Sequence, residues 1–120
     1  MIYILGSSGF IGQNLVRLMV LKKIKFKIIK KDKKKNYLMP KKIEDNDICI
    51  NLASITGFEC EKNKNISKLI NINLNKEILN NFKKIVFTST SSVYGDQDKY
   101  CDEKSSIYIT NYYTETKMQA

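Results

Sequence analysis

A tyrosine and a lysine near the end of the chain have the types and spacing of a proton-transfer pair. Tyr113 and Lys117 lie at positions i and i+4 of a predicted helix over 111–120, so the phenol and the ammonium group would be neighbours on one face. A nearby positive charge stabilises an ionised phenol, which can then remove a proton from a hydroxyl group. The alternative is that Tyr112 and Tyr113 form an aromatic pair that only packs the helix.

Hydroxyl side chains lie upstream of this pair, at the end of a predicted strand over 84–89. The run 88–92 consists of threonine and serine. Ligands bind at the carboxyl edge of open α/β sheets, so these hydroxyl groups are placed where a substrate would be. These hydroxyl groups could contact a substrate, or, as for Thr90, they could merely cap the end of the strand.

Three glycines follow a predicted first strand over 1–5 and lead into a helix. Gly6 would allow a sharp turn, Gly9 would let a diphosphate approach the backbone, and Gly12 would let the helix pack closely on the strand. Free N–H groups at the start of that helix favour a negatively charged ligand. Glycine-rich strand exits also serve as plain turns, so this spacing alone leaves both interpretations open.

These groups need a scaffold, and the chain alternates between strand-like and helix-like segments. Beyond the segments named above, we expect strands over 24–29 and 47–53, helices over 11–22 and 66–81, a loop over 33–46 with a short turn or edge strand, and a connecting loop over 54–65. The apolar residues at helical spacing in the first helix are Ile11, Leu15, Leu18, Met19 and Leu21. The alternation predicts an α/β fold, with a Rossmann-type parallel sheet of four strands and flanking helices.

Composition excludes several classes of site. The chain has no histidine, which removes Ser-His-Asp and Cys-His catalysis and most metal sites, so no metal is expected. Cys49, Cys60 and Cys101 form no C-x-x-C pair and predict reduced thiols. Neither a membrane-spanning apolar run nor a secretory leader is recognisable in the sequence, so we expect a cytoplasmic protein without a membrane partner.

The length and the charge of the chain restrict its partners. The chain has 120 residues, the size of one domain, and a formal net charge of +9. Lysine supplies nearly all of this charge, and the lysines concentrate between Lys22 and Lys42 without an arginine-rich stripe. We interpret them as a solvated surface. A role of one or two of these lysines in binding an anionic small ligand is the next alternative, and we expect no nucleic-acid partner.

Taken in chain order, these segments resemble the extended short-chain dehydrogenase/reductase family, in particular its NAD(P)-dependent nucleotide-sugar epimerases, dehydratases and reductases. The resemblance covers essentially the whole chain. Its motifs are Gly6-x-x-Gly9-x-x-Gly12, Asn51-Leu52-Ala53, Asn71 or Asn73 in the long helix, the segment 87–95, and Tyr113-x-x-x-Lys117.

The resemblance implies a role for each matching residue. Tyr113 corresponds to the acid/base tyrosine of the family, Lys117 to its partner lysine, and Thr90 to the hydroxyl residue that hydrogen-bonds the reacting group. A nicotinamide coenzyme would accept and return hydride. The residues that the resemblance places against the coenzyme are Gly6, Ser8, Gly9, Phe10, Ile11, Gly12, Lys30, Asn51, Leu52, Ala53, Tyr113 and Lys117.

Departures from the family pattern narrow this interpretation. NAD-preferring members have an acidic residue at the end of the second strand, where this chain has Lys30, followed by Lys31 and Asp32. A lysine there suits the 2′-phosphate of NADP, which is our first choice over NAD. Ser91 and Ser92 stand where sugar 4,6-dehydratases have Asp and Glu, which disfavours dehydration. The loop before the third strand lacks the adenine-flanking motif of the family, so no adenine contact is assigned.

The resemblance also implies that part of the enzyme lies outside this chain. In the family the tyrosine helix continues, further strands complete the sheet, and a carboxyl-terminal lobe binds the nucleotide sugar. We therefore expect residues 1–120 to be an incomplete NAD(P)-binding Rossmann domain at the amino terminus of a longer enzyme. Weak coenzyme binding and no turnover by the fragment would be consistent with this expectation, and a full-length homodimer is compatible with it.

The expected function is that of a nucleotide-sugar epimerase or 4-keto-sugar reductase that serves surface-polysaccharide synthesis. A non-catalytic NADP-sensing protein of the same fold is the main alternative, although a sensor would not need Thr90, Tyr113 or Lys117. A basic RNA-binding module, with Lys30 to Lys35 as its binding face, is a third interpretation. RNA affinity that falls steeply with salt and ignores NADPH would favour that module.

Overall fold

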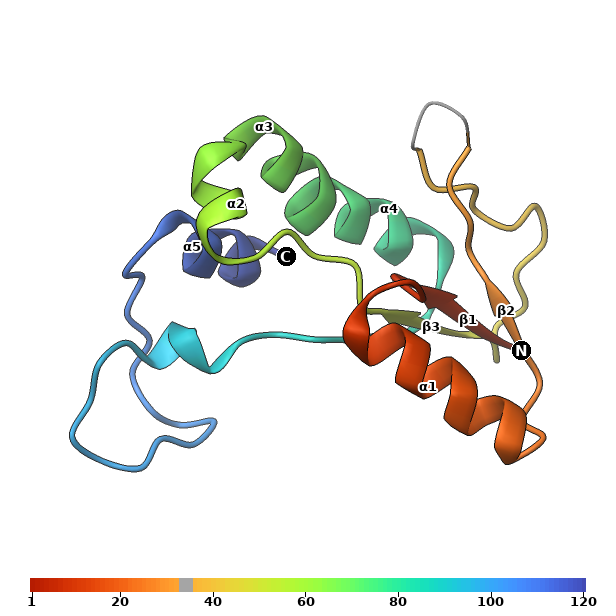
Figure 1. Ribbon diagram of the computed structural model, residues 1–120, viewed down its shortest axis with the longest axis horizontal. Coiled ribbons are helices and arrows are strands. Elements are labelled where there is room, and N and C mark those ends of the chain that lie inside the picture. The colour runs from red at the N-terminus through yellow and green to blue at the C-terminus, as the bar shows by residue number, and fades with distance from the viewer. Residues whose placement is uncertain (33–35) are drawn as a thin grey trace. The chain divides into compact units, whose positions relative to one another are not determined.

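The computed structural model describes residues 1–32 and 36–120 (Figure 1). These residues form two compact units, each described below by itself. Unit 1 comprises Met1–Ala53 and Glu77–Thr88, and unit 2 comprises Ser54–Lys76 and Ser89–Ala120. Residues 33–35, which belong to the predicted loop over 33–46 and to the lysine run of the RNA-binding interpretation, lie outside the described residues.

Unit 1 is built on a parallel sheet of four strands, as the sequence predicts. The sheet has the spatial order β2-β1-β3-β4, and its strands are β1 (Ile2–Leu5), β2 (Phe26–Ile28), β3 (Ile48–Asn51) and β4 (Lys84–Phe87). Ile4 of β1 pairs with Ile28 on one side and with Ile50 on the other. Because β1 is central, Tyr3, Ile4 and Leu5 are all buried, which explains its apolar sequence. The Rossmann-type α/β class is confirmed.

Helices cover both faces of this sheet. α1 (Phe10–Leu21) lies on one face, and the part of α4 (Leu74–Asn81) that begins at Glu77 lies on the other (Figure 1). On the α4 side, the ring of Tyr3 meets the edge of the Phe82 ring, with 5.4 Å between the centroids. Ile78 of α4 is fully buried. These aromatic and aliphatic contacts remove apolar surface from water and hold α4 on the sheet.

The face that α1 turns toward the sheet differs from the predicted one. Gly12 and Met19 are buried and Leu15 and Val16 are half-buried, which is the i, i+3, i+4, i+7 pattern of a single helical face. The prediction was wrong for three side chains, which are exposed: Ile11, Leu18 and Leu21. A glycine adds no hydrophobic signal to a sequence pattern, although here Gly12 marks the face that meets the turn after β1.

Unit 2 contains helices where the sequence predicts a connecting loop. α2 (Gly57–Lys62) and the first residues of α3 (Lys64–Ser67) fall within the segment 54–65, so that prediction was wrong. α2 is short and mostly polar, and tertiary contacts hold it. Cys60 is fully buried, and its carbonyl accepts a hydrogen bond from Ser67 Oγ at 3.2 Å. Packing rather than local propensity therefore stabilises this helix.

The predicted long helix over 66–81 is present and contains a wide turn. α3 leads into the π-helical segment η1 (Lys68–Asn73), which leads into α4. Such π-helical segments are rare and frequently mark functional sites. Asn71 lies within η1 and is buried.

The carboxyl-terminal part of unit 2 contains the predicted tyrosine helix. A short 3₁₀ helix, η2 (Ser91–Tyr94), follows β4, and α5 (Tyr112–Gln119) confirms the helix expected over 111–120. Asn111 caps α5, because its side-chain oxygen accepts a hydrogen bond from the N–H of Thr114 at 2.8 Å. α5 contacts η1, α2 and η2. Over the described ranges, no helix is both long enough and apolar enough to span a membrane.

Candidate active site

The turn after β1 brings the exit of β3 against a glycine. Gly6 has a φ of +75°, which residues with side chains rarely adopt. A Cβ atom on Gly6 would lie 2.6 Å from the carbonyl carbon of Leu52 and 2.7 Å from the nitrogen of Ala53. Only a glycine permits this approach, which joins two of the segments predicted to bind the coenzyme.

Gly12 and Gly9 lack a side chain for different reasons. A Cβ atom on Gly12 would lie 2.7 Å from the Cα atom of Ser7, so the packing of α1 on the turn requires a glycine. Gly9 has an ordinary φ of −74°, and a Cβ atom there would make an ordinary contact of 3.5 Å with the carbonyl oxygen of Gly6. The described fold therefore does not require a glycine at position 9. Its missing side chain leaves room for a ligand at the turn.

The amino terminus of α1 is open to a negatively charged ligand. Within the described part of the chain no side chain caps this helix, and its first turn contains no acidic residue. Phe10 and Ile11 are exposed. The carbonyl of Ser8 accepts a hydrogen bond from Gln13 Nε2 at 2.7 Å. Backbone N–H groups at such a helix end favour a phosphate. Ser8, Phe10 and Ile11 lie at this end of α1.

The end of β2 borders a cleft beside the glycine turn. The cleft has a volume of about 280 Å³ and is lined by Gly6, Ser7, Ser8, Ile28, Ile29, Lys30, Lys31 and Tyr37. Lys30, which the resemblance places against the coenzyme, thus lines the cleft beside the glycine turn. Asp32 is not among the lining residues, and its carboxylate accepts a hydrogen bond from the N–H of Asn36 at 2.8 Å. The carboxylate that follows β2 is thus bonded to the backbone of Asn36, and two lysines border the cleft instead.

A buried amide side chain holds the exit of β3. Asn51 is fully buried, and its Oδ1 accepts a hydrogen bond from the N–H of Ala53 at 3.0 Å. Thr88 Oγ1 donates to the carbonyl of Asn51 at 3.5 Å, which links the ends of β3 and β4. Ala53 is buried and Leu52 is half-buried. The predicted Asn51-Leu52-Ala53 segment therefore has a defined backbone beside Gly6.

Tyr113 and Lys117 lie in unit 2, one helical turn apart on α5. Lys117 is only 5% exposed, and this burial lowers the pKa of its ammonium group to about 8. The group therefore keeps its positive charge at neutral pH. Tyr113 is half-buried. The hydroxyl of Tyr112 donates to the carbonyl of Lys64 at 3.3 Å, and the Lys64 ammonium lies 5.2 Å from the centroid of the same ring, so Tyr112 has a separate structural role.

A buried asparagine in η1 ties α5 to the loop after β3. Asn71 Oδ1 accepts a hydrogen bond from the N–H of Ile55 at 2.8 Å, and Asn71 Nδ2 donates to Thr116 Oγ1 at 2.9 Å. Thr116 Oγ1 in turn donates to the carbonyl of Tyr113 at 2.8 Å. Asn73, the alternative left open by the sequence, is exposed. Asn71 is therefore the asparagine that supports the tyrosine helix.

Thr116 is a supporting residue that the sequence reasoning missed. It is fully buried, and it lies three residues after Tyr113 and directly before Lys117. A threonine hydroxyl inside a helix can reach the carbonyl three or four residues earlier, so its position was a usable signal.

Thr90 lies at the amino end of η2 in unit 2. Its Oγ1 accepts a hydrogen bond from the N–H of Ser92 at 3.3 Å and donates to Ser92 Oγ at 3.1 Å. The hydroxyl thus caps η2. This role is similar to the capping of the strand end, which the sequence left open as the alternative to catalysis. A hydroxyl oxygen has two acceptor sites, so the cap leaves one of them for another donor.

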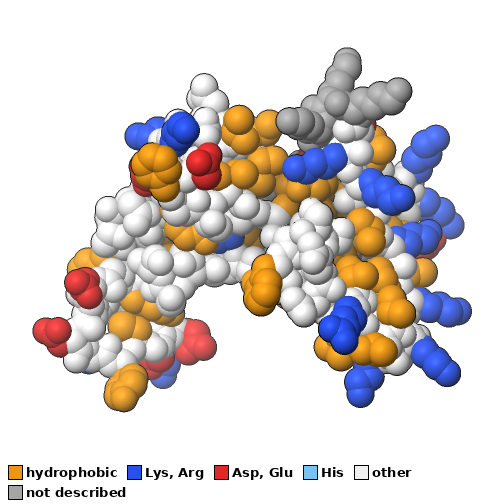
Figure 2. Space-filling model, in the orientation of Figure 1, with side chains coloured by type: hydrophobic (Ala, Val, Ile, Leu, Met, Phe, Trp, Pro, Cys, Tyr) orange, Lys and Arg blue, Asp and Glu red, His pale blue; other side chains and the backbone are white. Residues whose placement is uncertain are grey.

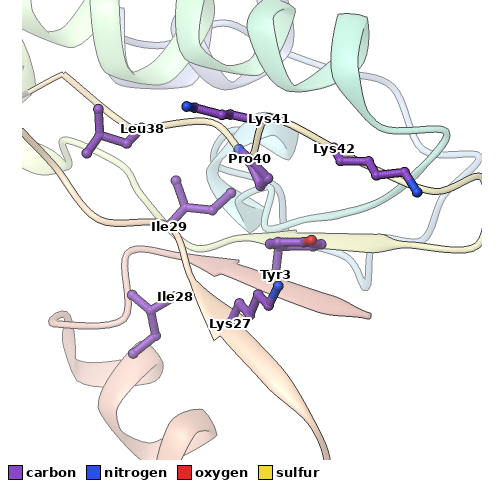
Figure 3. Close-up of a pocket in the computed structure, with 8 residues that line it drawn as sticks. All are labelled: Tyr3, Lys27, Ile28, Ile29, Leu38, Pro40, Lys41 and Lys42. Atoms are coloured by element: carbon purple, nitrogen blue, oxygen red, sulfur yellow. The ribbon is translucent and has the colours of Figure 1, made fainter.

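A second cleft in unit 1 has apolar walls and no convergent polar groups (Figure 3). It has a volume of about 380 Å³ and is lined by Tyr3, Lys27, Ile28, Ile29, Leu38, Pro40, Lys41 and Lys42. Lys27 points toward the ring of Tyr3, with its ammonium 5.9 Å from the centroid. Lys41 and Lys42 point away from one another, and Lys42 pairs with Glu44 at 2.8 Å. These lysines do not form a phosphate site.

Most lysines of unit 1 are spread over its surface. Figure 2 shows Lys and Arg side chains distributed over the part of the face that β2 and α1 occupy in Figure 1. The lysines of this region are exposed: Lys22, Lys23, Lys25, Lys27, Lys30 and Lys31. Of these, Lys30 and Lys31 border the cleft beside the glycine turn.

Comparisons with known proteins identify a family and similar folds. The model of the NAD dependent epimerase/dehydratase family matches residues 2–120, which include both units. The comparison with curated proteins gave no match.

Several solved structures share the fold. UDP-glucuronic acid 4-epimerase from Bacillus cereus in complex with NAD has a TM-score of 0.73 and 20% identity, over 98% of this chain and 48% of that one. RMD from Pseudomonas aeruginosa complexed with NADPH has a TM-score of 0.76 and 19% identity, over 99% and 47%. UDP-N-acetylglucosamine 4-epimerase from Bacillus cereus has a TM-score of 0.70 and 23% identity, over 98% and 50%. This chain therefore spans about half the length of these proteins.

Proposed function

Because the chain belongs to the NAD dependent epimerase/dehydratase family, we propose that it is the coenzyme-binding part of a nucleotide-sugar epimerase or 4-keto-sugar reductase. The chain spans about half the length of similar solved structures, so the proposed activity is that of an enzyme that also has a substrate lobe. Two of those structures are 4-epimerases of UDP-sugars, which supports a nucleotide sugar as the substrate. Ser91 and Ser92, in place of the acidic pair of the dehydratases, speak against dehydration.

One observation carries the proposal. Gly6 and Gly12 are required by the backbone around them, whereas Gly9 is not required by any contact of the described fold. A missing side chain without a structural reason, beside an open helix amino terminus, is what the approach of a diphosphate requires. We propose that Gly6, Ser8, Gly9, Phe10, Ile11 and Gly12 form this part of the coenzyme site, together with Asn51, Leu52 and Ala53.

We propose NADP rather than NAD as the coenzyme. Lys30 and Lys31 border the cleft beside the glycine turn, and a lysine ammonium can pair with the additional phosphate of NADP. Asp32, the acidic residue closest to the end of β2, accepts a hydrogen bond from Asn36. Similar structures contain either NAD or NADPH, so the preference rests on these residues.

Three residues of unit 2 would carry out the proton chemistry. When bound, the coenzyme supplies the nicotinamide ring that accepts and returns hydride. Tyr113 would remove the proton of the substrate hydroxyl at its phenol oxygen and later return it. Lys117, whose pKa of about 8 keeps it charged at pH 7, would stabilise negative charge on that oxygen. Thr90 would hold the substrate oxygen through its hydroxyl group.

Two valine substitutions test the coenzyme site. We expect Gly9→Val to weaken NADPH binding at least tenfold while the thermal stability stays close to that of the wild type, because valine tolerates φ −74° and a Cβ atom at this position makes only an ordinary contact of 3.5 Å. Gly12→Val is the matched control, and it should lower both binding and stability, since its Cβ atom would collide with the turn. Isothermal titration with NADPH and a thermal melt of each variant provide the two measurements.

Two outcomes would contradict the proposed coenzyme site. Unchanged affinity of Gly9→Val for NADPH and NADH would show that the turn is structural. The absence of saturable binding of either coenzyme to the wild-type chain would reject both the proposed enzyme and the NADP-sensing alternative.

A further inference from the structure

After β2, residues 30–31 pair in antiparallel fashion with residues 37–38 at the cleft beside the glycine turn. The N–H of Leu38 donates to the carbonyl of Lys30 at 2.9 Å, and Lys31 pairs with Tyr37 in an isolated antiparallel bridge. Beside this pairing, the carboxylate of Asp32 accepts a hydrogen bond from the N–H of Asn36 at 2.8 Å. This arrangement fixes Tyr37 directly across from Lys31.

The tyrosine ring restrains the lysine beside it. The Lys31 ammonium lies 4.7 Å from the centroid of the Tyr37 ring, within the range of an attractive cation–π contact. A surface lysine ordinarily samples many rotamers, and holding it in one place has an entropic cost that a preformed contact reduces. Lys31 is therefore oriented before any ligand arrives.

The same residues border one cavity. Lys30, Lys31 and Tyr37 line the cleft together with Gly6, Ser7 and Ser8, so two lysines border the cavity that adjoins the glycine turn. In the second cleft of unit 1, Lys41 and Lys42 point away from one another (Figure 3). Lys42 also pairs with Glu44. Two lysines and a tyrosine at one cavity suit a phosphate carried by a nucleoside, and a ribose without that phosphate would leave the lysine charges unmatched.

We propose that Tyr37 is a specificity-determining residue, which holds Lys31 at the cleft so that Lys30 and Lys31 together bind the 2′-phosphate of an adenosine. This inference rests on the proposed coenzyme binding and adds a residue that no motif indicated. Tyr37 acts through Lys31, so it is a positioning residue, and its effect should depend on whether the ligand has a 2′-phosphate.

Small nucleotides isolate this effect from the rest of the coenzyme. Calorimetric titration of the chain with adenosine 2′,5′-bisphosphate and with adenosine 5′-monophosphate should show a preference for the bisphosphate of about 100-fold, or about tenfold for each charge-assisted contact. Tyr37→Leu should reduce this preference about tenfold, mainly by weakening the binding of the bisphosphate. Tyr37→Phe keeps the ring face and should retain the preference.

Two further variants make the test specific. Lys31→Met should reproduce the loss seen in Tyr37→Leu, and the double variant should lose little more, because one residue acts through the other. Lys27→Met is the matched control: it also removes one positive charge near a tyrosine ring, but at the other cleft, and should leave the preference unchanged. Circular dichroism confirms that each variant is folded.

The outcomes separate this inference from the proposed function. A wild-type preference that survives Tyr37→Leu, or losses from Tyr37→Leu and Lys31→Met that simply add, would overturn the role of Tyr37 and leave coenzyme binding intact. Equal binding of the two nucleotides by the wild type would reject the phosphate site. If NADPH and NADH also fail to bind, the proposed function falls with it.

Discussion

At the scale of single residues, Lys117 couples stability to pH. Burial lowers the pKa of its ammonium group from 10.5 to about 8. Between these two values the unfolded chain binds more protons than the folded one, so the contribution of Lys117 to the free energy of unfolding rises with pH. Below pH 8 the cost of burying the charge is fully present, on the order of 3 kcal/mol. Such a cost is typical of a functional position.

We therefore expect Lys117→Met to raise the free energy of unfolding at pH 7. The gain should be smaller than the burial cost, because the variant also loses the other contacts of the lysine. It should shrink as the pH rises from about 8 toward 10.5, since the wild-type group then becomes neutral. Urea unfolding of both proteins across this range measures the difference. A gain that does not change with pH would mean that charge burial is not its cause.

At the scale of elements, the support of α5 comes from a helix distant in the chain. Asn71 of η1 donates to Thr116 Oγ1, and Thr116 Oγ1 donates to the carbonyl of Tyr113. Both side chains are buried, so each lost hydrogen bond would leave a polar atom without water. This network fixes the turn of α5 that presents Tyr113 and Lys117.

Removing the Thr116 hydroxyl should loosen this connection. Thr116→Val keeps the side-chain shape but removes the acceptor of Asn71, and we expect it to lower the free energy of unfolding by about 1–3 kcal/mol. Thr116→Ser retains the hydroxyl and should cost less than half as much. Urea unfolding of the two variants distinguishes the effects. A Thr116→Val variant as stable as the wild type would show that these hydrogen bonds do not support α5.

At the scale of the whole molecule, the predicted residues divide between the two units. The glycine turn, Lys30 and the Asn51-Leu52-Ala53 segment belong to unit 1, whereas Thr90, Tyr113 and Lys117 belong to unit 2. The family model covers both units. We propose that residues 1–120 form a single coenzyme-binding domain. In this domain, a substitution in unit 2 can abolish proton transfer without weakening coenzyme binding.

Tyr113→Phe tests this separation. In a form of the enzyme that contains the proposed substrate lobe, we expect the variant to lose turnover of a nucleotide sugar by at least 100-fold, because the acid/base hydroxyl is absent. Its affinity for NADPH should change less than threefold. Tyr112→Phe is the control, since that hydroxyl bonds the Lys64 carbonyl, and it should retain activity. Turnover that persists in Tyr113→Phe would overturn the acid/base role of Tyr113, whereas coenzyme binding without any turnover by the wild-type enzyme would favour the NADP-sensing alternative.

The sequence by itself determined the features that depend on local pattern. Alternating apolar runs and helical periods were enough for the parallel sheet and for the helices α1, α4 and α5, because backbone geometry sets those periods. The glycine spacing, and the separation of Tyr113 and Lys117 by one helical turn, are local properties of the same kind. The family could be recognised from these motifs for that reason.

Only the tertiary structure decided the features that depend on contacts between distant segments. α2 forms although its sequence is polar, because Cys60 is buried in unit 2. The buried face of α1 is centred on Gly12, which has no side chain to signal it. The choice of Asn71 over Asn73 and the contact between Lys31 and Tyr37 likewise required the fold. Hydrogen bonds and burial across the chain have no sequence period, so no local pattern could predict them.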